Sequence, residues 1–229
     1  MLLNLGLGMG GLLSSLIIQK GDLISFQIMY WVDSATFLVY LMIVLSLRGE
    51  HVNKYIPKEH EPKQGSYRDL MQIKPLMYLG IAGIIIFTFG YGTIQAGIPV
   101  FATQFLELSP KWLGIIFGVN TISIVVFQPL VMRILEKYST YTALISIGII
   151  WAISWLFVGF APYLPMLASG LAICASQLIF AFGEMVHAPT SPALTQELAP
   201  EHIRGRASAL TSLQWGISGI AGPAVAGLM

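Results

Sequence analysis

Two carboxylates lie inside long apolar stretches of the chain, and they are the residues most able to do chemistry. Asp33 follows Trp-Val, Glu184 lies within Phe-Gly-Glu-Met, and no Lys or Arg accompanies either acid within its stretch. A carboxyl group held away from water and from cations favours its neutral form, so each could take up and release a proton. We therefore expect Glu184 and, secondarily, Asp33 to couple proton movement. For Asp33 the competing interpretation is a polar bond to a neighbouring helix.

Glu184 precedes His187 by three residues, so the two side chains share a helix face. This Glu-x-x-His spacing also occurs in carboxylate metal sites, but those need a second copy, which the chain lacks. Cys174 is the sole cysteine, which excludes an intrachain disulfide and a cysteine-based metal site. The sequence contains no phosphate-binding Gly-x-x-x-x-Gly-Lys-Ser/Thr, no Gly-x-Ser-x-Gly and no His-Glu-x-x-His. We expect no enzyme activity, no cofactor and no metal.

Uncharged polar and aromatic side chains recur within the same apolar stretches. Together they suit a roomy, weakly polar cavity for a small-molecule substrate. The predicted cavity residues are Tyr91, Gln95, Asn120, Gln177, Gln214 and Trp215. For each amide, a hydrogen bond that joins two helices is the competing interpretation.

Seven apolar runs must position these residues. They cover residues 1–18, 23–47, 76–101, 112–132, 141–160, 163–186 and 207–229. Most are near the ~20 residues that cross the hydrocarbon of a bilayer. With 55% hydrophobic and only 10% charged residues, the chain has more apolar surface than a water-soluble fold could bury. Lipid offers the backbone no hydrogen bonds, so the runs are predicted to be α-helices, giving an all-α, polytopic membrane helix bundle embedded in a lipid bilayer.

The cations indicate an orientation in the membrane. If the connections alternate between sides, ten of the twelve Lys and Arg residues fall on one side, and only Lys20 and Lys111 on the other. Loops rich in Lys and Arg stay in the cytoplasm, so this side is predicted to be cytoplasmic, and the plasma membrane is the expected location. A net charge of +1 spread over loops argues against a nucleic-acid partner.

The longest polar interruption, residues 49–75, divides two apolar runs from five. Pro57, Pro62 and many charged residues favour a central cytoplasmic loop. Near its end, Ser66 can cap a short helix whose apolar residues, such as Leu70, would rest on the membrane surface. An unstructured tether is the alternative.

Three motifs resemble the major facilitator superfamily. Gly10-Gly11-Leu-Leu-Ser-Ser in the first run has a partner, Gly222-Pro223-Ala-Val-Ala-Gly, in the last, and both are similar to the family's Gly-Pro-x-x-Gly-Gly signature. Parallel repeats of this kind build transporter halves. The stretch 132–137, which ends in Glu136 and Lys137, resembles the family's Gly-x-x-x-Asp-Arg turn, with Met, Glu and Lys as the replacements. The stretch 199–206 resembles its Ala-Pro-Glu-x-x-Arg-Gly-Arg loop and contributes Arg204, Gly205 and Arg206.

This resemblance implies a twelve-helix transporter of which the chain covers helices five to eleven. Residues 1–48 would hold the last two helices of the N-terminal half, the first of them truncated. Residues 49–75 would be the central loop, and residues 76–229 five of the six helices of the C-terminal half. The chain would then work only together with the remaining helices of the full-length protein. The resemblance implies packing or gating roles for the glycines, the proline and the charged residues of these motifs.

The implied function is secondary transport, with proton-coupled efflux of hydrophobic or cationic drugs as the leading hypothesis, because Glu184 resembles the Gly-Glu of multidrug antiporters on the helix that lines the cavity. The alternative is a facilitator or symporter of a sugar, peptide or other metabolite. A retinal protein is disfavoured because no Lys lies within a run to hold retinal. An intramembrane hydrolase is disfavoured because no nucleophile and base lie together at depth.

Overall fold

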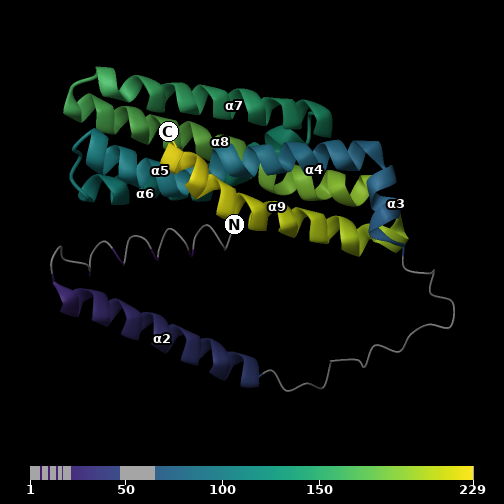
Figure 1. Ribbon diagram of the computed structural model, residues 1–229, viewed down its shortest axis with the longest axis horizontal. Helices are drawn as coiled ribbons and strands as arrows, with labels where there is room; N and C mark the ends of the chain where they lie inside the picture. The colour runs from purple at the N-terminus through teal and green to yellow at the C-terminus, as the bar shows by residue number, and fades with distance from the viewer. Residues whose placement is uncertain are drawn as a thin grey trace.

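The computed structural model describes residues 22–46 and 65–228, together with residues 6, 10, 14 and 17. Within those residues every regular element is a helix, which confirms the predicted all-α fold (Figure 1). The α-helices are α2 (Leu23–Ser46), α3 (Tyr67–Gln72), α4 (Lys74–Ile86), α5 (Thr93–Val100), α6 (Lys111–Leu135), α7 (Thr140–Phe160), α8 (Met166–Leu198) and α9 (Arg204–Leu228). Two π-helices, η1 (Phe87–Gly92) and η2 (Phe101–Phe105), and two 3-10 helices, η3 (Ala161–Tyr163) and η4 (Glu201–Ile203), lie between them.

Five helical segments of the described chain are long and apolar enough to cross a membrane. They are α2, the continuous rod from α4 to η2, α6, α7 with η3, and α8. The sixth long helix, α9, has 25 residues but is less apolar, because glycine, serine and glutamine take many of its positions. Small residues of this kind let membrane helices approach closely. The run at residues 1–18 lies largely outside the described residues. The chain is an integral membrane protein.

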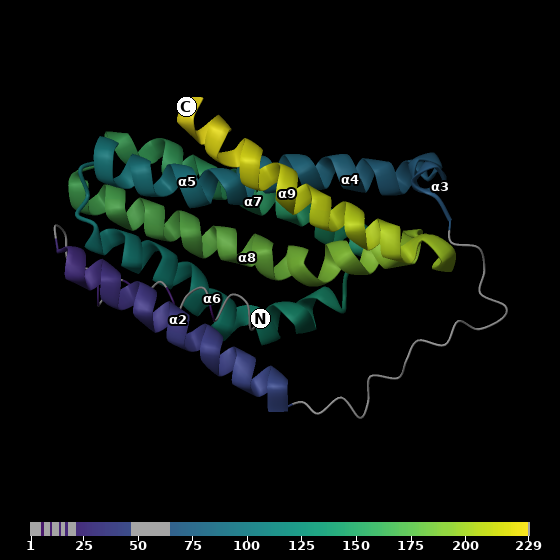
Figure 2. The ribbon, with the colours of Figure 1, turned by 60° about the horizontal axis from the view of Figure 1, so that its bottom comes forward.

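Helix α8 is the centre of the bundle formed by α4 to α9. It packs along α6 on one side and α7 on the other, and its middle carries the largest share of buried side chains, including Ile173, Phe180 and Met185. Helix α9 crosses the rod made of α4, η1 and α5 obliquely (Figure 2). The site described below lies where this rod, α6 and α8 meet.

The crossing of α9 and η1 depends on two glycines. A Cβ placed on Gly92 would lie 2.6 Å from the Cα of Gly222, and one placed on Gly222 would collide with the backbone of Gly92 in turn. One turn earlier on each helix, the hydroxyl groups of Thr88 and Ser218 are 3.2 Å apart and hydrogen-bonded. The two backbones therefore touch, and a polar bond between neighbouring turns holds the crossing.

Helix α2 lies apart from the bundle in Figure 1. Its side chains are exposed almost throughout, from Leu23 at 71% to Leu45 at 71%. A helix that is apolar all around and exposed on every face suits hydrocarbon rather than water as its surroundings.

The end of the predicted central loop folds as the short helix α3. The Ser66 hydroxyl accepts a hydrogen bond from the Arg68 N–H at 3.0 Å, and Asp69 accepts one from the Ser66 N–H at 2.6 Å. This capping box confirms the predicted capped helix. Leu70, however, is 3% exposed and packs in a cluster with Leu76, Ala199, Ile203 and Ala207, so its predicted place on the membrane surface is wrong. Leu70 packs against protein rather than lipid because η4 and the start of α9 present apolar side chains to it.

Loss of the capping box is expected to loosen α3. In Ser66→Ala the side-chain acceptor for Arg68 is missing, and such a change costs about 1 kcal/mol of local stability. Hydrogen exchange measured by mass spectrometry should show faster exchange over residues 67–72 and unchanged exchange in α7, whose cap is Ser139. Unchanged protection of α3 would mean that its packing alone holds it.

Candidate functional site: a buried carboxylate among aromatic rings

Glu184 lies in the middle of the bundle, and neutral hydrogen-bonding groups hold its carboxylate. The side chain is 9% exposed. Asn120 of α6 donates a hydrogen bond from Nδ2 to Glu184 Oε2 at 2.6 Å. The hydroxyl of Tyr91, on η1, forms a second side-chain hydrogen bond to the same carboxylate. Three separate segments of the bundle therefore converge on one acid.

Local features of the helices bring these groups together. Helices α6 and α8 lie side by side, and Gln128 ties them by donating to the backbone oxygen of Met185 at 3.3 Å, beside Glu184. Tyr91 lies in a π-helical turn, where the wider winding changes the direction in which side chains point. Such turns are frequent at functional sites. Glu184 thus meets its partners through helix packing rather than through neighbours in the sequence.

Trp151 of α7 supports the site from behind. Its indole N–H donates to the backbone oxygen of Phe180 at 3.0 Å, and its ring stacks on the Phe180 ring at 4.4 Å between centroids. Two glycines make room for the indole: a Cβ on Gly90 would lie 3.0 Å from it, and a Cβ on Gly183 would overlap it. Gly183, directly before Glu184, therefore has a packing role that the acid depends on.

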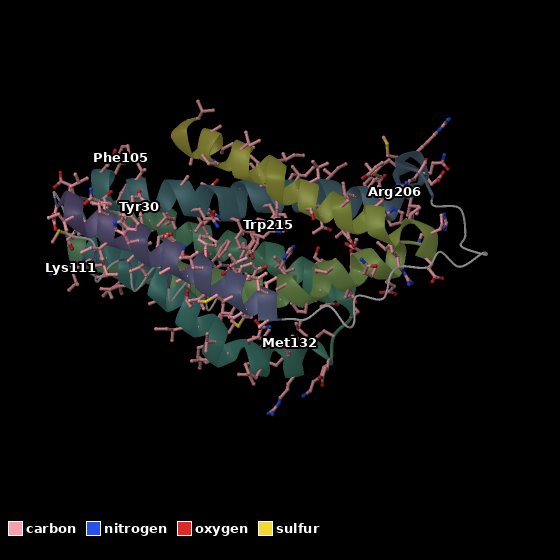
Figure 3. All side chains as sticks on the ribbon, turned by 90° about the horizontal axis from the view of Figure 1, so that it is seen from below. Tyr30, Phe105, Lys111, Met132, Arg206 and Trp215 are labelled. Carbon is pink, nitrogen blue, oxygen red and sulfur yellow. The ribbon has the colours of Figure 1, made fainter. Side chains whose placement is uncertain are left out.

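Aromatic rings gather around Tyr91, the ring whose hydroxyl reaches the Glu184 carboxylate. Tyr91 lies 5.0 Å from Trp215, which is labelled in Figure 3, and 5.4 Å from Trp151, measured between ring centroids. Phe87 lies 4.4 Å from Trp215 and 5.2 Å from His187, whose ring it meets edge-on. The faces of aromatic rings carry partial negative charge and attract cations. A carboxylate together with such rings makes these surroundings favourable for positive charge.

Glu184 has no cationic partner among the described residues, since its hydrogen bonds come from an amide and a hydroxyl. A buried carboxylate without a counter-ion is costly in its charged form. It can be made neutral by a proton or balanced by a positively charged ligand. The arrangement therefore allows a proton and a cation to compete for one position.

The other predicted cavity residues do not all reach Glu184. Gln214 is buried on α9 and donates from Nε2 to the backbone oxygen of Gly80 at 3.0 Å, which joins two helices. Gln95 is exposed on α5. Gln177 is 1% exposed on α8, two turns before Glu184, and its Nε2 has no hydrogen-bond partner among the described residues. Asp33 lies exposed on α2, apart from the bundle. Their roles in a cavity stay predictions.

The unpaired amide of Gln177 leads to a stability prediction. Methionine has a similar volume and places no polar hydrogen in the core, so Gln177→Met should raise the free energy of unfolding by about 1 kcal/mol. Denaturant titration of the protein in detergent micelles measures this, with exposed Gln95→Met as the matched control that should change little. A loss of stability in Gln177→Met would show that the amide has a partner that the described side chains do not supply.

The motif residues lie at the ends of helices and at the crossing. Glu136 and Lys137 follow the end of α6 and are exposed. Arg204 donates from Nε to the backbone oxygen of Ala199 at 3.3 Å, which stabilises the turn before α9. The guanidinium of Arg206 lies 5.5 Å from the Tyr67 ring centroid, so it ties α9 to α3. Gly205 has open space around it, Pro223 lies inside α9 next to Gly222, and Gly10 is exposed, while Gly11 lies outside the described residues.

Figure 3 shows Lys111 and Phe105 at one end of the bundle and Arg206 toward the other. The helix directions agree, because α6 begins at Lys111 and α9 begins at Arg204. This separation is the one that the charge distribution predicts.

Sequence reasoning missed several residues that build the site. Phe87, Trp151 and Phe180 read as ordinary apolar residues, and Gly92 as an unremarkable glycine. The one local signal was Gly183 directly before Glu184, because a glycine next to a buried acid can indicate that another side chain packs closely there. The remaining contacts join residues far apart in the chain, such as Asn120 and Glu184, and no local pattern encodes them.

Comparison with known proteins gives one match. The sequence model of the Major Facilitator Superfamily matches residues 1–223. No curated protein and no solved structure matches the chain. The match spans almost the whole sequence, including the apolar runs, the central polar interruption and the helix that carries Glu184. The chain therefore belongs to the Major Facilitator Superfamily, a family of secondary transporters.

Proposed function

We propose that the chain is part of a proton-coupled exporter of hydrophobic or cationic compounds, with Glu184 as the group that exchanges protons for substrate. The observation that supports this most is a buried carboxylate that has only Asn120 and Tyr91 as partners and aromatic rings around it. A sugar or peptide would need several polar groups in the cavity. The described residues near Glu184 offer mainly rings.

The partners of Glu184 suit both of its protonation states. When the carboxylate is charged, the Asn120 amide and the Tyr91 hydroxyl can both donate to it. When the acid is neutral, its own O–H needs an acceptor, and the Tyr91 oxygen can serve because a phenol both donates and accepts. Both donors are therefore paired when Glu184 is charged, and the Tyr91 oxygen offers the acid's O–H an acceptor when it is neutral.

Exchange at this position would couple transport to the proton gradient. A cation that binds next to charged Glu184 and the Trp215 ring would leave when the acid takes up a proton from the other side. Each ~100 mV of membrane potential contributes ~2.3 kcal/mol per charge moved, which is a sufficient drive without a nucleotide. The basic loops, residues 49–75 among them, would face the cytoplasm, in the plasma membrane.

Transport into proteoliposomes tests this function. The full-length transporter is reconstituted, a pH gradient is imposed, and uptake of tetraphenylphosphonium is compared with uptake of a neutral hexose. If the transporter exchanges cations for protons, the cation should move only when the pH gradient is present, and the hexose should not move. Movement of the sugar alone would instead favour the facilitator or symporter hypothesis.

A further inference from the structure

A cavity lies between α6, α7 and α8, and its lining does not include Glu184, Asn120 or Tyr91. It is a groove of about 310 Å³ between the last turns of α6 and the first turns of α7, with α8 behind it. Phe182 and Val186 of α8 line its back, and Ile134 and Ala143 line its sides. Helices α6 and α7 each pack along α8 but hardly touch one another, which leaves the groove open along its length.

The groove presents carbon rather than polar atoms. Its lining is aliphatic and aromatic apart from three hydroxyl-bearing residues. Ser146 donates its hydroxyl to the backbone oxygen of Ala143 at 2.7 Å, and the Thr142 hydroxyl is hydrogen-bonded to Ser139 at 2.9 Å. Both hydroxyls are thus satisfied within α7 and its cap. A hydrocarbon chain fits such a surface, whereas a polar solute would lose hydrogen bonds to water.

Two exposed cations neighbour the lining residues of the groove along the chain. Arg133 and Lys137 are exposed and flank Ile134, which lines the groove, while Glu136 is the carboxylate between them. The end of α6 that carries them is near Met132, labelled in Figure 3. Helix α7 begins beside them at Thr140, and a helix N-terminus favours negative charge. The two cations and the helix N-terminus together carry more positive charge than the one carboxylate neutralises, so this region favours an anion.

We propose that this groove binds an anionic glycerophospholipid, with an acyl chain along Phe182, Val186 and Ile150 and the phosphate at Arg133 and Lys137. The apolar groove and these cations belong to the same end of the bundle, where α6 ends and α7 begins, as the tail and head of such a lipid lie next to each other. Juxtamembrane Lys and Arg residues attract anionic headgroups in this way. The site is separate from Glu184 and does not rest on the proposed transport function.

Native mass spectrometry of the full chain in detergent tests the site. The protein is titrated with phosphatidylglycerol and, separately, with phosphatidylcholine carrying the same acyl chains. We expect a saturable phosphatidylglycerol adduct. Arg133→Gln with Lys137→Gln should weaken that adduct by roughly tenfold or more, because each cation near a headgroup contributes. Glu136→Gln should strengthen it.

Filling the groove tests the acyl-chain half of the proposal. Ser146→Leu places an apolar side chain in the groove and should reduce binding of phosphatidylglycerol. Gly148→Leu places a leucine on the same helix where a Cβ meets nothing within 4 Å, and this variant should bind like the unchanged protein. Circular dichroism and thermal unfolding check that each variant is folded. Equal binding of both lipids, or undiminished binding in the folded Ser146→Leu and double Gln variants, would overturn the proposal.

Discussion

The Glu184→Gln variant of the full-length transporter is expected to lose proton-driven export while keeping its fold. Glutamine has the size of glutamate and can accept the hydrogen bonds of Asn120 and Tyr91, so the bundle should assemble normally. It carries no charge and cannot exchange a proton. Efflux of an organic cation against its gradient should fall to the level of membranes without transporter, and cation affinity should fall by roughly tenfold or more.

A control on the same helix separates this effect from a general loss of charge. Glu197 lies exposed near the end of α8, so Glu197→Gln should export at the unchanged rate. Dye efflux from energised cells, with protein levels matched by immunoblot, measures both variants. Undiminished efflux in Glu184→Gln would remove Glu184 from the coupling mechanism and leave its buried position without a transport role.

The Gly222→Ala variant is expected to show the largest loss of stability of any glycine-to-alanine change in α9. The new methyl group would collide with the backbone of Gly92 across the crossing, and a backbone cannot rotate away as a side chain can. Overpacking of this kind costs about 1–3 kcal/mol. The displaced helices would also strain the hydrogen bond between Thr88 and Ser218. Unfolding in mixed micelles, followed by circular dichroism, gives the free energy.

Gly219 supplies the matched control for this prediction. It lies three residues earlier on α9, and a Cβ placed there meets nothing within 4 Å. Alanine is the better helix former by about 1 kcal/mol, so Gly219→Ala should be as stable as the unchanged protein or more so. If Gly222→Ala and Gly219→Ala unfold alike, the two backbones do not touch at this crossing.

Much of the fold follows from the sequence because hydropathy acts on each helix separately. Long apolar runs predict α6, α7 and α8, and Ser66 with Asp69 predicts the start of α3. The direction in which α3 packs was not predictable. Whether Leu70 meets lipid or protein depends on Ile203, which is distant in the sequence and becomes its neighbour only when α9 folds back.

Within the candidate site, Glu184 could be predicted from the sequence alone, whereas the arrangement of the residues around it could not. Glu184 is evident because an acid in an apolar run is rare and costly. Its partner Asn120 belongs to a set of polar residues that look alike in the sequence, and Gln214 of that set proves to join two helices instead. The π-helical turn that presents Tyr91 has no sequence signature among its Phe, Thr and Gly residues. Packing between helices selects among these candidates.

The competition between a proton and a cation at Glu184 is most directly tested by counting protons. Tetraphenylphosphonium is added to the purified full-length transporter in weakly buffered detergent, and the released protons are measured with a pH indicator alongside the bound cation. At a pH where Glu184 is protonated before the cation is added, we expect about one proton released per bound cation, and none from the Glu184→Gln variant. Cation binding without proton release, or equal release from both proteins, would contradict it.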